Sequence, residues 1–278
     1  MPRIDAHQHF WKFDPVRDAW IGEDMYVIRR DFLPHHLSPI LKAGGMDGSI
    51  VVQSDQSPEE NLFQLTHAAA HPFIKGVVGW VDLQAEDLDD QLAMYRQYPL
   101  LKGFRHILQG EAQRDFMLRP DFLQGIGRLA RYGYTYDILI YPRHLPVAAE
   151  FVERLPHQRF VLDHLAKPQI TTGEIETWAR GIRRLAAFPN VFCKLSGLVT
   201  ECDWRHWTPE QIVPYLDVTF ECFGADRLII GSDWPVCLVA APYSRAVDVV
   251  KNYLDRYTEK TREAVLGGNA QRLWRLKT

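Results

Sequence analysis

The chain has 278 residues, of which 46% are hydrophobic, and this length is close to the roughly 250 residues of one (β/α)₈ barrel. Its net charge is −3 and no run of lysine or arginine stands out, which argues against a nucleic-acid partner and favours a small molecule. No apolar run approaches the ~20 residues that a membrane span needs, no signal-like segment follows Met1, and four widely spaced cysteines indicate a reduced, cytoplasmic protein.

Short β-branched runs recur along the chain, and a longer amphipathic stretch follows each of them. This alternation is typical of parallel strands joined by crossover helices. We expect eight strands, at residues 2–6, 48–53, 75–81, 102–107, 135–140, 159–163, 190–195 and 227–232. They predict an α/β fold, a (β/α)₈ TIM barrel in which residues 1–278 form a single domain.

Several helices between these strands have readable ends. The first starts near residue 33 and ends at Gly44-Gly45. The sequence SPEE at 57–60 combines a capping serine, a proline at the first helical position and a glutamate three residues after the cap, so it predicts a helix over 58–70. TPEQ at 208–211 starts another helix by the same logic.

Two segments are too long for a simple turn between a strand and a helix, namely residues 10–32 and 198–207. Both follow predicted strands, so both should lie over the mouth of the barrel, where substrate loops belong. Their tryptophans either stack on a ring-shaped substrate or pack the loops down: Trp11, Trp20, Trp204 and Trp207.

An open, doubly wound sheet is the competing α/β architecture. Its nucleotide-binding versions carry a glycine-rich turn after the first strand. Residues 6–11 read AHQHFW at that position, and the chain has no G-x-G-x-x-G sequence. The barrel is therefore favoured.

The first predicted strand is followed by His7 and His9, in the sequence H-Q-H. Residues two apart on an extended chain point to the same side. Both imidazoles can therefore converge on one point, as ligands of one metal ion or as donors to one oxyanion. An isolated H-x-H is equally consistent with two polar groups on the surface.

Two further strand ends carry residues of similar chemistry. Asp233 follows RLIIGS and His164 follows RFVLD, at the edge where the active sites of such barrels lie. Alone, Asp233 could be a helix N-cap and His164 a buried histidine bonded to the backbone. Three strand ends that carry metal-binding or proton-transferring residues together favour a catalytic site.

Six motifs in chain order resemble the amidohydrolase superfamily: IDAHQHFW, GFRH, VLDHLAKP, CKLSGL, GSDWPV and GGNAQRLW. The resemblance covers about residues 3–276. Within the superfamily, the motifs are most similar to those of the metal-independent or mononuclear lactonases, which include L-fucono- and L-rhamnono-lactonases and dicarboxylic pyrone lactonases. It implies that His7 and His9 are the first-strand pair and His164 the sixth-strand histidine. It also implies that Asp233 is the eighth-strand aspartate that activates water.

The chain departs from the larger superfamily at two strand ends. Strand four offers Arg105 and His106 instead of a bridging lysine, and strand five ends in Tyr141 instead of histidine. A two-metal centre is therefore not expected. The chain offers ligands for at most one divalent ion, which we expect to be zinc. These ligands are His7, His9, His164 and Asp233. We expect that activity does not require the ion.

Neighbouring residues on a strand face opposite ways, so only one of Arg105 and His106 can point into the barrel. We favour His106 toward the pocket or its rim, with Arg105 as the alternative. An inward arginine would suit a carbonyl oxygen or a carboxylate, whereas an outward one would form an ordinary surface salt bridge. The further candidates for substrate binding lie at or near strand ends: Gln53, Trp80, Tyr141 and Lys194.

The expected activity is hydrolysis of a lactone, of the L-fucono or L-rhamnono type, in carbohydrate catabolism. Asp233 would take a proton from water and return it to the leaving oxygen, and the histidines would stabilise the oxyanion, directly or through an ion. The alternatives are a pyrone lactonase, an aromatic acid decarboxylase, a metal-dependent nuclease and a non-catalytic barrel. The lack of a basic run disfavours the nuclease. The sequence does not determine the oligomeric state, and a homo-oligomer is possible.

Overall fold

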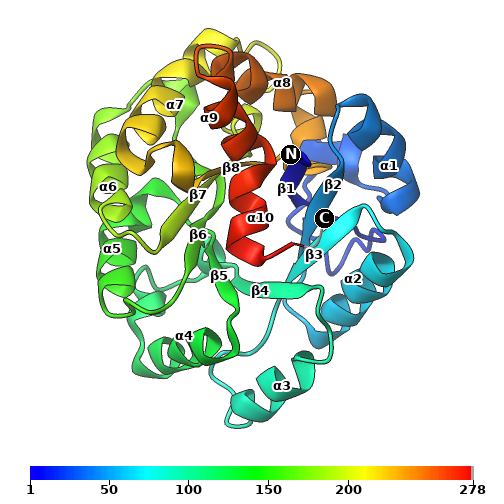
Figure 1. Cartoon of the computed structure of the whole chain (residues 1–278), viewed down its shortest axis with the longest axis vertical. Coiled ribbons are helices and arrows are strands. Elements are labelled where there is room, and N and C mark those ends of the chain that lie inside the picture. The colour runs from blue at the N-terminus through cyan, green and yellow to red at the C-terminus, as the bar shows by residue number, and fades with distance from the viewer. Residues whose placement is uncertain (277–278) are drawn as a thin grey trace.

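A ring of eight parallel strands forms the centre of the molecule (Figure 1). The computed structural model describes residues 1–276, so the last two residues of the expected domain lie outside it. The strands are β1 (Ile4–Gln8), β2 (Gly48–Val52), β3 (Ile74–Gly79), β4 (Leu101–His106), β5 (Thr135–Ile138), β6 (Phe160–Leu162), β7 (Val191–Leu195) and β8 (Leu228–Ile230). Each pairs with the next in parallel, and a backbone bridge between Gln8 and Trp234 joins the two ends of the series. The predicted single-domain (β/α)₈ barrel is confirmed.

Helices surround this ring on the outside (Figure 1). These outer helices are α1 (Pro34–Ala43), α2 (Pro58–Ala70), α3 (Leu88–Tyr95), α4 (Pro120–Tyr132), α5 (Leu145–Glu153), α6 (Glu176–Ala186), α7 (Pro209–Phe223) and α8 (Tyr243–Leu254). Two further helices follow in the chain, α9 (Glu259–Glu263) and α10 (Asn269–Trp274). The predicted caps are present, since Ser57 Oγ accepts from the Glu60 amide and Thr208 forms a reciprocal cap with Gln211. No helix among residues 1–276 is both long and apolar enough to cross a membrane.

The helix α10 lies across the centre of the ring in Figure 1. Its apolar residues pack against strand residues that point into the barrel, among them Ile4, Ile50 and Val161. Gln271 of this helix donates to the carbonyl oxygen of Pro2, just before β1 begins. The helix therefore closes the N-terminal end of the barrel and leaves the C-terminal end for function.

The strand β1 starts and ends two residues later than predicted, so His7 lies inside it. All five residues of β1 are buried, although three of them are polar or charged: Asp5, His7 and Gln8. The sequence predicted that the strand ends at residue 6, just before the first histidine, because a buried parallel strand is normally a run of apolar residues. The interior of this barrel instead pairs its polar side chains with one another.

Candidate active site

A cavity of about 420 Å³ opens at the C-terminal end of the barrel. Strand ends contribute His9, Arg105, His164 and Asp233 to its lining, and loops contribute Trp20, Met25, Tyr141, Lys167, Glu201 and Trp204. The long segments 10–32 and 198–207 therefore cover the barrel mouth as predicted. This is the end at which barrel enzymes place their active sites.

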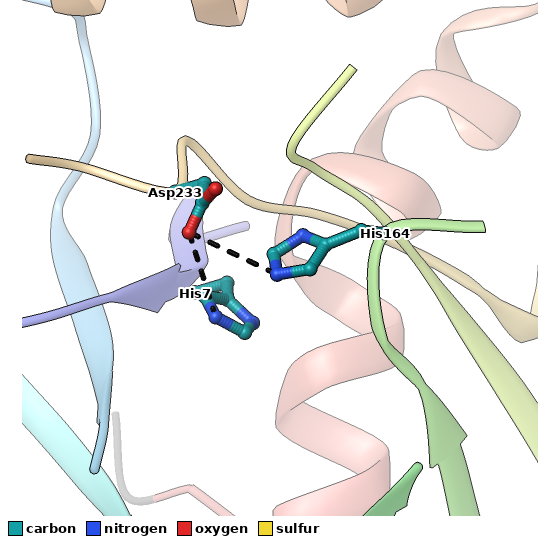
Figure 2. A group of neighbouring side chains, drawn as sticks. All are labelled: His7, His164 and Asp233. Carbon is teal, nitrogen blue, oxygen red and sulfur yellow. Dashed lines mark ion pairs between the residues drawn. The ribbon is translucent and has the colours of Figure 1, made fainter. Parts of the chain in front are cut away.

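The carboxylate of Asp233 lies among three histidine rings at the floor of the cavity. Its Oδ1 is 3.4 Å from Nε2 of His9 and 3.8 Å from Nε2 of both His7 and His164. Figure 2 shows the last two contacts. Asp233 has a φ of +58°, and its amide donates to the carbonyl oxygen of His7 at 2.8 Å, which fixes the carboxylate above β1. It caps no helix, because the next helical turn begins after Pro235 without a side-chain cap.

Each of these histidines is held through its other ring nitrogen. Nδ1 of His9 bonds the carbonyl oxygen of Val52 at 2.7 Å, and Nδ1 of His164 bonds Oγ of Ser196 at 2.8 Å. Nδ1 of His7 contacts Nζ of Lys194 at 3.2 Å. These contacts orient all three rings so that their Nε2 atoms lie near the carboxylate.

An unusual backbone turn presents His164 to the cavity. Residues 164–167 all have positive φ angles between 52° and 58°, a conformation that costs about 1–2 kcal/mol for each non-glycine residue. The carbonyl oxygen of Leu165 is held in this turn by the indole N–H of Trp178 at 2.7 Å. The same turn places Lys167 on the cavity wall.

The protonation states follow from burial and from the charges nearby. Burial lowers the pKa of His164 to about 4, and burial together with the charge of Lys194 lowers the pKa of His7 well below its ordinary value. Burial alone would raise the pKa of Asp233, but the neighbouring histidines outweigh it and the pKa is lowered. At neutral pH the floor therefore holds an anionic carboxylate beside neutral imidazoles of His7 and His164.

A network of buried charges extends inward from Arg105 in the cavity wall. NH1 of Arg105 contacts Oδ2 of Asp163 at 2.9 Å, and Nζ of Lys194 contacts Oδ1 of Asp163 at 3.0 Å and also pairs with Asp137. Gln53 accepts from Arg105 through its side chain at 3.0 Å. The sequence did not single out Asp137 or Asp163, although each is a charged residue within or directly after a short apolar strand, which is an available signal.

Arg105, and not His106, faces the pocket, so the preference for His106 is wrong. Arg105 is 4% exposed, lines the cavity and has NH1 3.4 Å from Nε2 of His7. His106 points outward, where its Nε2 meets Glu111 at 2.6 Å and its ring stacks on Phe116. The arginine can be buried because Asp163 compensates its charge, and that partner comes from a distant part of the sequence.

The other residues predicted to bind substrate lie in different places relative to the cavity. Tyr141 lines the cavity, whereas Gln53 and Lys194 are buried beneath it. Trp80 donates toward Nδ1 of His106 at 3.4 Å and is not among the described residues that line the cavity.

The four mouth-loop tryptophans also divide. Trp20 and Trp204 line the cavity. Trp11 and Trp207 are buried and donate to backbone carbonyl oxygens of Arg30 and Ala240, so they hold the loops in place. One pair of tryptophans therefore lies where it can stack on a substrate, and the other pair packs the loops down.

The floor also fits one zinc ion. Ligand atoms of His7, His164 and Asp233 lie within 4.8 Å of one another, and His9 adjoins them, with its Nε2 3.2 Å from that of His7. Tetrahedral zinc with bonds of about 2.1 Å places its ligand atoms about 3.4 Å apart, close to the distances found here. An imidazole that donates through Nδ1 to a carbonyl oxygen carries, in its neutral form, a lone pair on Nε2, and Nε2 of His9 faces the carboxylate. Two acceptors that face each other suit a cation between them.

The fold and this cluster define an amidohydrolase. The chain belongs to that family, whose model, described as amidohydrolase, matches residues 4–276. It is 40% identical to an L-fucono-1,5-lactonase of Burkholderia multivorans, over 99% of this chain and 96% of that one. It is 38% identical to an L-fucono-1,5-lactonase of Burkholderia ambifaria, with the same shares covered. A crystal structure of an amidohydrolase from Burkholderia multivorans with bound zinc matches all of both chains at a TM-score of 0.97 and 40% identity.

Proposed function

We propose that the chain is a carboxylic ester hydrolase that opens a sugar lactone, with L-fucono-1,5-lactone as the first candidate substrate. The observation that carries this proposal is the anionic carboxylate of Asp233 at the cavity floor, with three imidazole Nε2 atoms within 3.8 Å. Two relatives of 38–40% identity that are named L-fucono-1,5-lactonases support the choice of substrate.

Asp233 is the general base in this proposal. A water molecule beside its carboxylate attacks the lactone carbonyl carbon, and the proton transfers to Asp233 as the water oxygen gains positive charge. Its carboxylate is anionic at neutral pH, because its pKa is lowered, and it can therefore accept this proton. A positioned base of this kind contributes about 10² to 10⁴ in rate.

Arg105 stabilises the negative charge that develops on the carbonyl oxygen. Its guanidinium lines the cavity and is held by Asp163 and Gln53, so no reorganisation is needed during the reaction. When bound, a zinc ion held by His7, His164 and Asp233, with His9 adjacent, would supply Lewis acidity at the same place. His164 and His7 are neutral, as ligands must be.

The cavity lining favours a neutral polyol over a dicarboxylate. Arg105 and Lys167 are the arginine and lysine residues among the described lining residues, and Glu201 and Asp233 offset their charge. Two substrate carboxylate groups would call for an excess of positive charge. Trp20 and Trp204 offer aromatic faces to a sugar ring, and Tyr141 offers a hydroxyl group.

A pH-indicator screen tests the proposal directly. The purified chain is given sugar lactones, an aromatic lactone and a pyrone dicarboxylate, and acid release is recorded above the spontaneous rate, with Asp233→Asn protein as the control for contaminants. We expect the fastest turnover on a six-carbon sugar 1,5-lactone. Acid release on no lactone, or release of carbon dioxide from an aromatic acid instead, would overturn it.

A further inference from the structure

Glu201 is a second carboxylate in the wall of the active-site cavity. It ends the short helical turn η7 (Val199–Glu201) in the mouth loop, and it also lines an adjoining cavity of about 480 Å³. Tyr141 and Lys167 line both cavities as well. Glu201 therefore stands at the boundary between the reaction site and a second opening.

The backbone at Glu201 is fixed by hydrogen bonds, whereas its carboxylate is not held in the same way by the described residues. Thr171 donates to the carbonyl oxygen of Glu201 at 3.0 Å, and the amide of Glu201 donates to the carbonyl oxygen of Leu198 at 3.2 Å. Within residues 1–276, no hydrogen bond or ion pair holds the side-chain carboxylate. The carboxylate is therefore available to a group that enters the cavity, such as a substrate oxygen.

We propose that Glu201 is the general acid that protonates the ring oxygen as the lactone opens. This rests on the proposed lactonase function and divides its proton transfers between two carboxylates. An alkoxide is a poor leaving group, so the bond from the carbonyl carbon to the ring oxygen breaks most easily when a proton arrives with it.

The environment of Glu201 supports this role. Burial raises the pKa of Glu201 to about 6, and Lys167 offsets only part of that rise, so the group can carry a proton in a cavity that it shares with Asp233. The charged or titratable groups that share this cavity with Glu201 are His9, Arg105, Tyr141, His164, Lys167 and Asp233.

The proton balance closes over one turnover. Water gives one proton to Asp233 and its oxygen to the carbonyl carbon. The electron pair of the broken carbon–oxygen bond goes to the ring oxygen, which takes the proton of Glu201. Asp233 then loses its proton to solvent and Glu201 regains one, so the net reaction is lactone plus water to hydroxy acid.

The test compares Glu201→Gln with wild type on the best sugar lactone between pH 5 and 7.5, with spontaneous hydrolysis subtracted. Glutamine keeps the shape and the hydrogen bonding but cannot deliver a proton. We expect kcat to fall by about 10² or more. Wild-type kcat should decline as the pH rises through about 6, and this alkaline limb should be absent in the variant.

Two variants make the result specific. Glu201→Asp, which keeps the acid, should recover part of kcat together with the alkaline limb. Glu174→Gln is the matched control, because Glu174 lines only the adjoining cavity and accepts from Thr177 at 3.1 Å, and it should behave as wild type.

A Glu201→Gln variant with wild-type kcat and only a raised KM would overturn the acid role and leave Glu201 as a hydroxyl-binding residue. An alkaline limb that persists in that variant would overturn it equally. Both outcomes leave the proposed function standing, whereas wild-type protein inactive on every lactone refutes the function itself.

Discussion

Removing Lys194 should destabilise the whole barrel. Its Nζ is completely buried, pairs with Asp137 and lies 3.0 Å from Oδ1 of Asp163, so Lys194→Met leaves two buried carboxylates with Arg105 as their remaining close cation. Removing one partner of a buried ion pair costs about 3–5 kcal/mol. The entropy of unfolding of a chain of 278 residues is about 0.6 kcal/mol/K, so Tm should fall by about 5–9 °C.

The loss should also depend on pH. Burial already raises the pKa of Asp137, and Lys194 opposes that rise, so the variant's pKa should be higher still. A carboxyl group whose folded pKa is raised contributes stability at low pH, and that stability is lost as the pH rises through the folded value. The free energy of unfolding of Lys194→Met should therefore lie nearer to that of wild type at pH 5 than at pH 8.

Urea unfolding followed by tryptophan fluorescence at both pH values measures these differences. Arg154→Met is the matched control, because it breaks a half-exposed ion pair with Glu150 and should cost less than about 1 kcal/mol. The double variant Lys194→Met with Asp137→Asn should regain part of the loss, because one uncompensated charge is gone. A Lys194→Met protein within 1 kcal/mol of wild type at pH 8 would refute the argument that this lysine compensates buried charge.

Three further predictions concern the cavity. Exhaustive chelation, checked by elemental analysis, should leave a large part of the lactonase activity because the Arg105 guanidinium stays in place; complete loss that zinc reverses would contradict this. Arg105→Gln should lower kcat by about 10² or more, the usual cost of losing an oxyanion donor, whereas His106→Gln should stay within a few-fold of wild type; equal effects in steady-state assays would count against the assignment. Gly197→Ala should lower kcat at least about tenfold, because its Cβ would lie 2.6 Å from Nδ1 of His164, and a small displacement of a catalytic group is costly. Gly173→Ala is its control, since Gly173 also has positive φ but no atom within 4 Å of an added Cβ; equal kcat values for the two variants would contradict the steric argument.

Local signals predicted most of the barrel. The caps at Ser57 and Thr208 depend on residues three positions apart, so a single sequence contains all the information that they need. The late start of β1 was not predictable in this way. The extension of β1 to Gln8 depends on pairing with Val51 and Trp234, which come from distant parts of the chain.

The same distinction explains the site. His164 and Asp233 were identifiable because each directly follows a predicted apolar strand. The direction of Arg105 was not, because it depends on Asp163, which lies 58 residues further along. Glu201 gave no signal of its own within the mouth loop, since its environment is created by the cavity that the folded chain forms.

The kinetics of Asp233→Asn test the central claim most directly. Asparagine nearly matches aspartate in shape and tolerates the left-handed φ of +58° at this position, so the fold should persist. Steady-state hydrolysis of the best sugar lactone, measured beside a thermal melt, should show a normal Tm and a kcat lower by about 10² to 10⁴. A variant that melts normally and keeps more than about a tenth of wild-type kcat would contradict the role of Asp233 as general base.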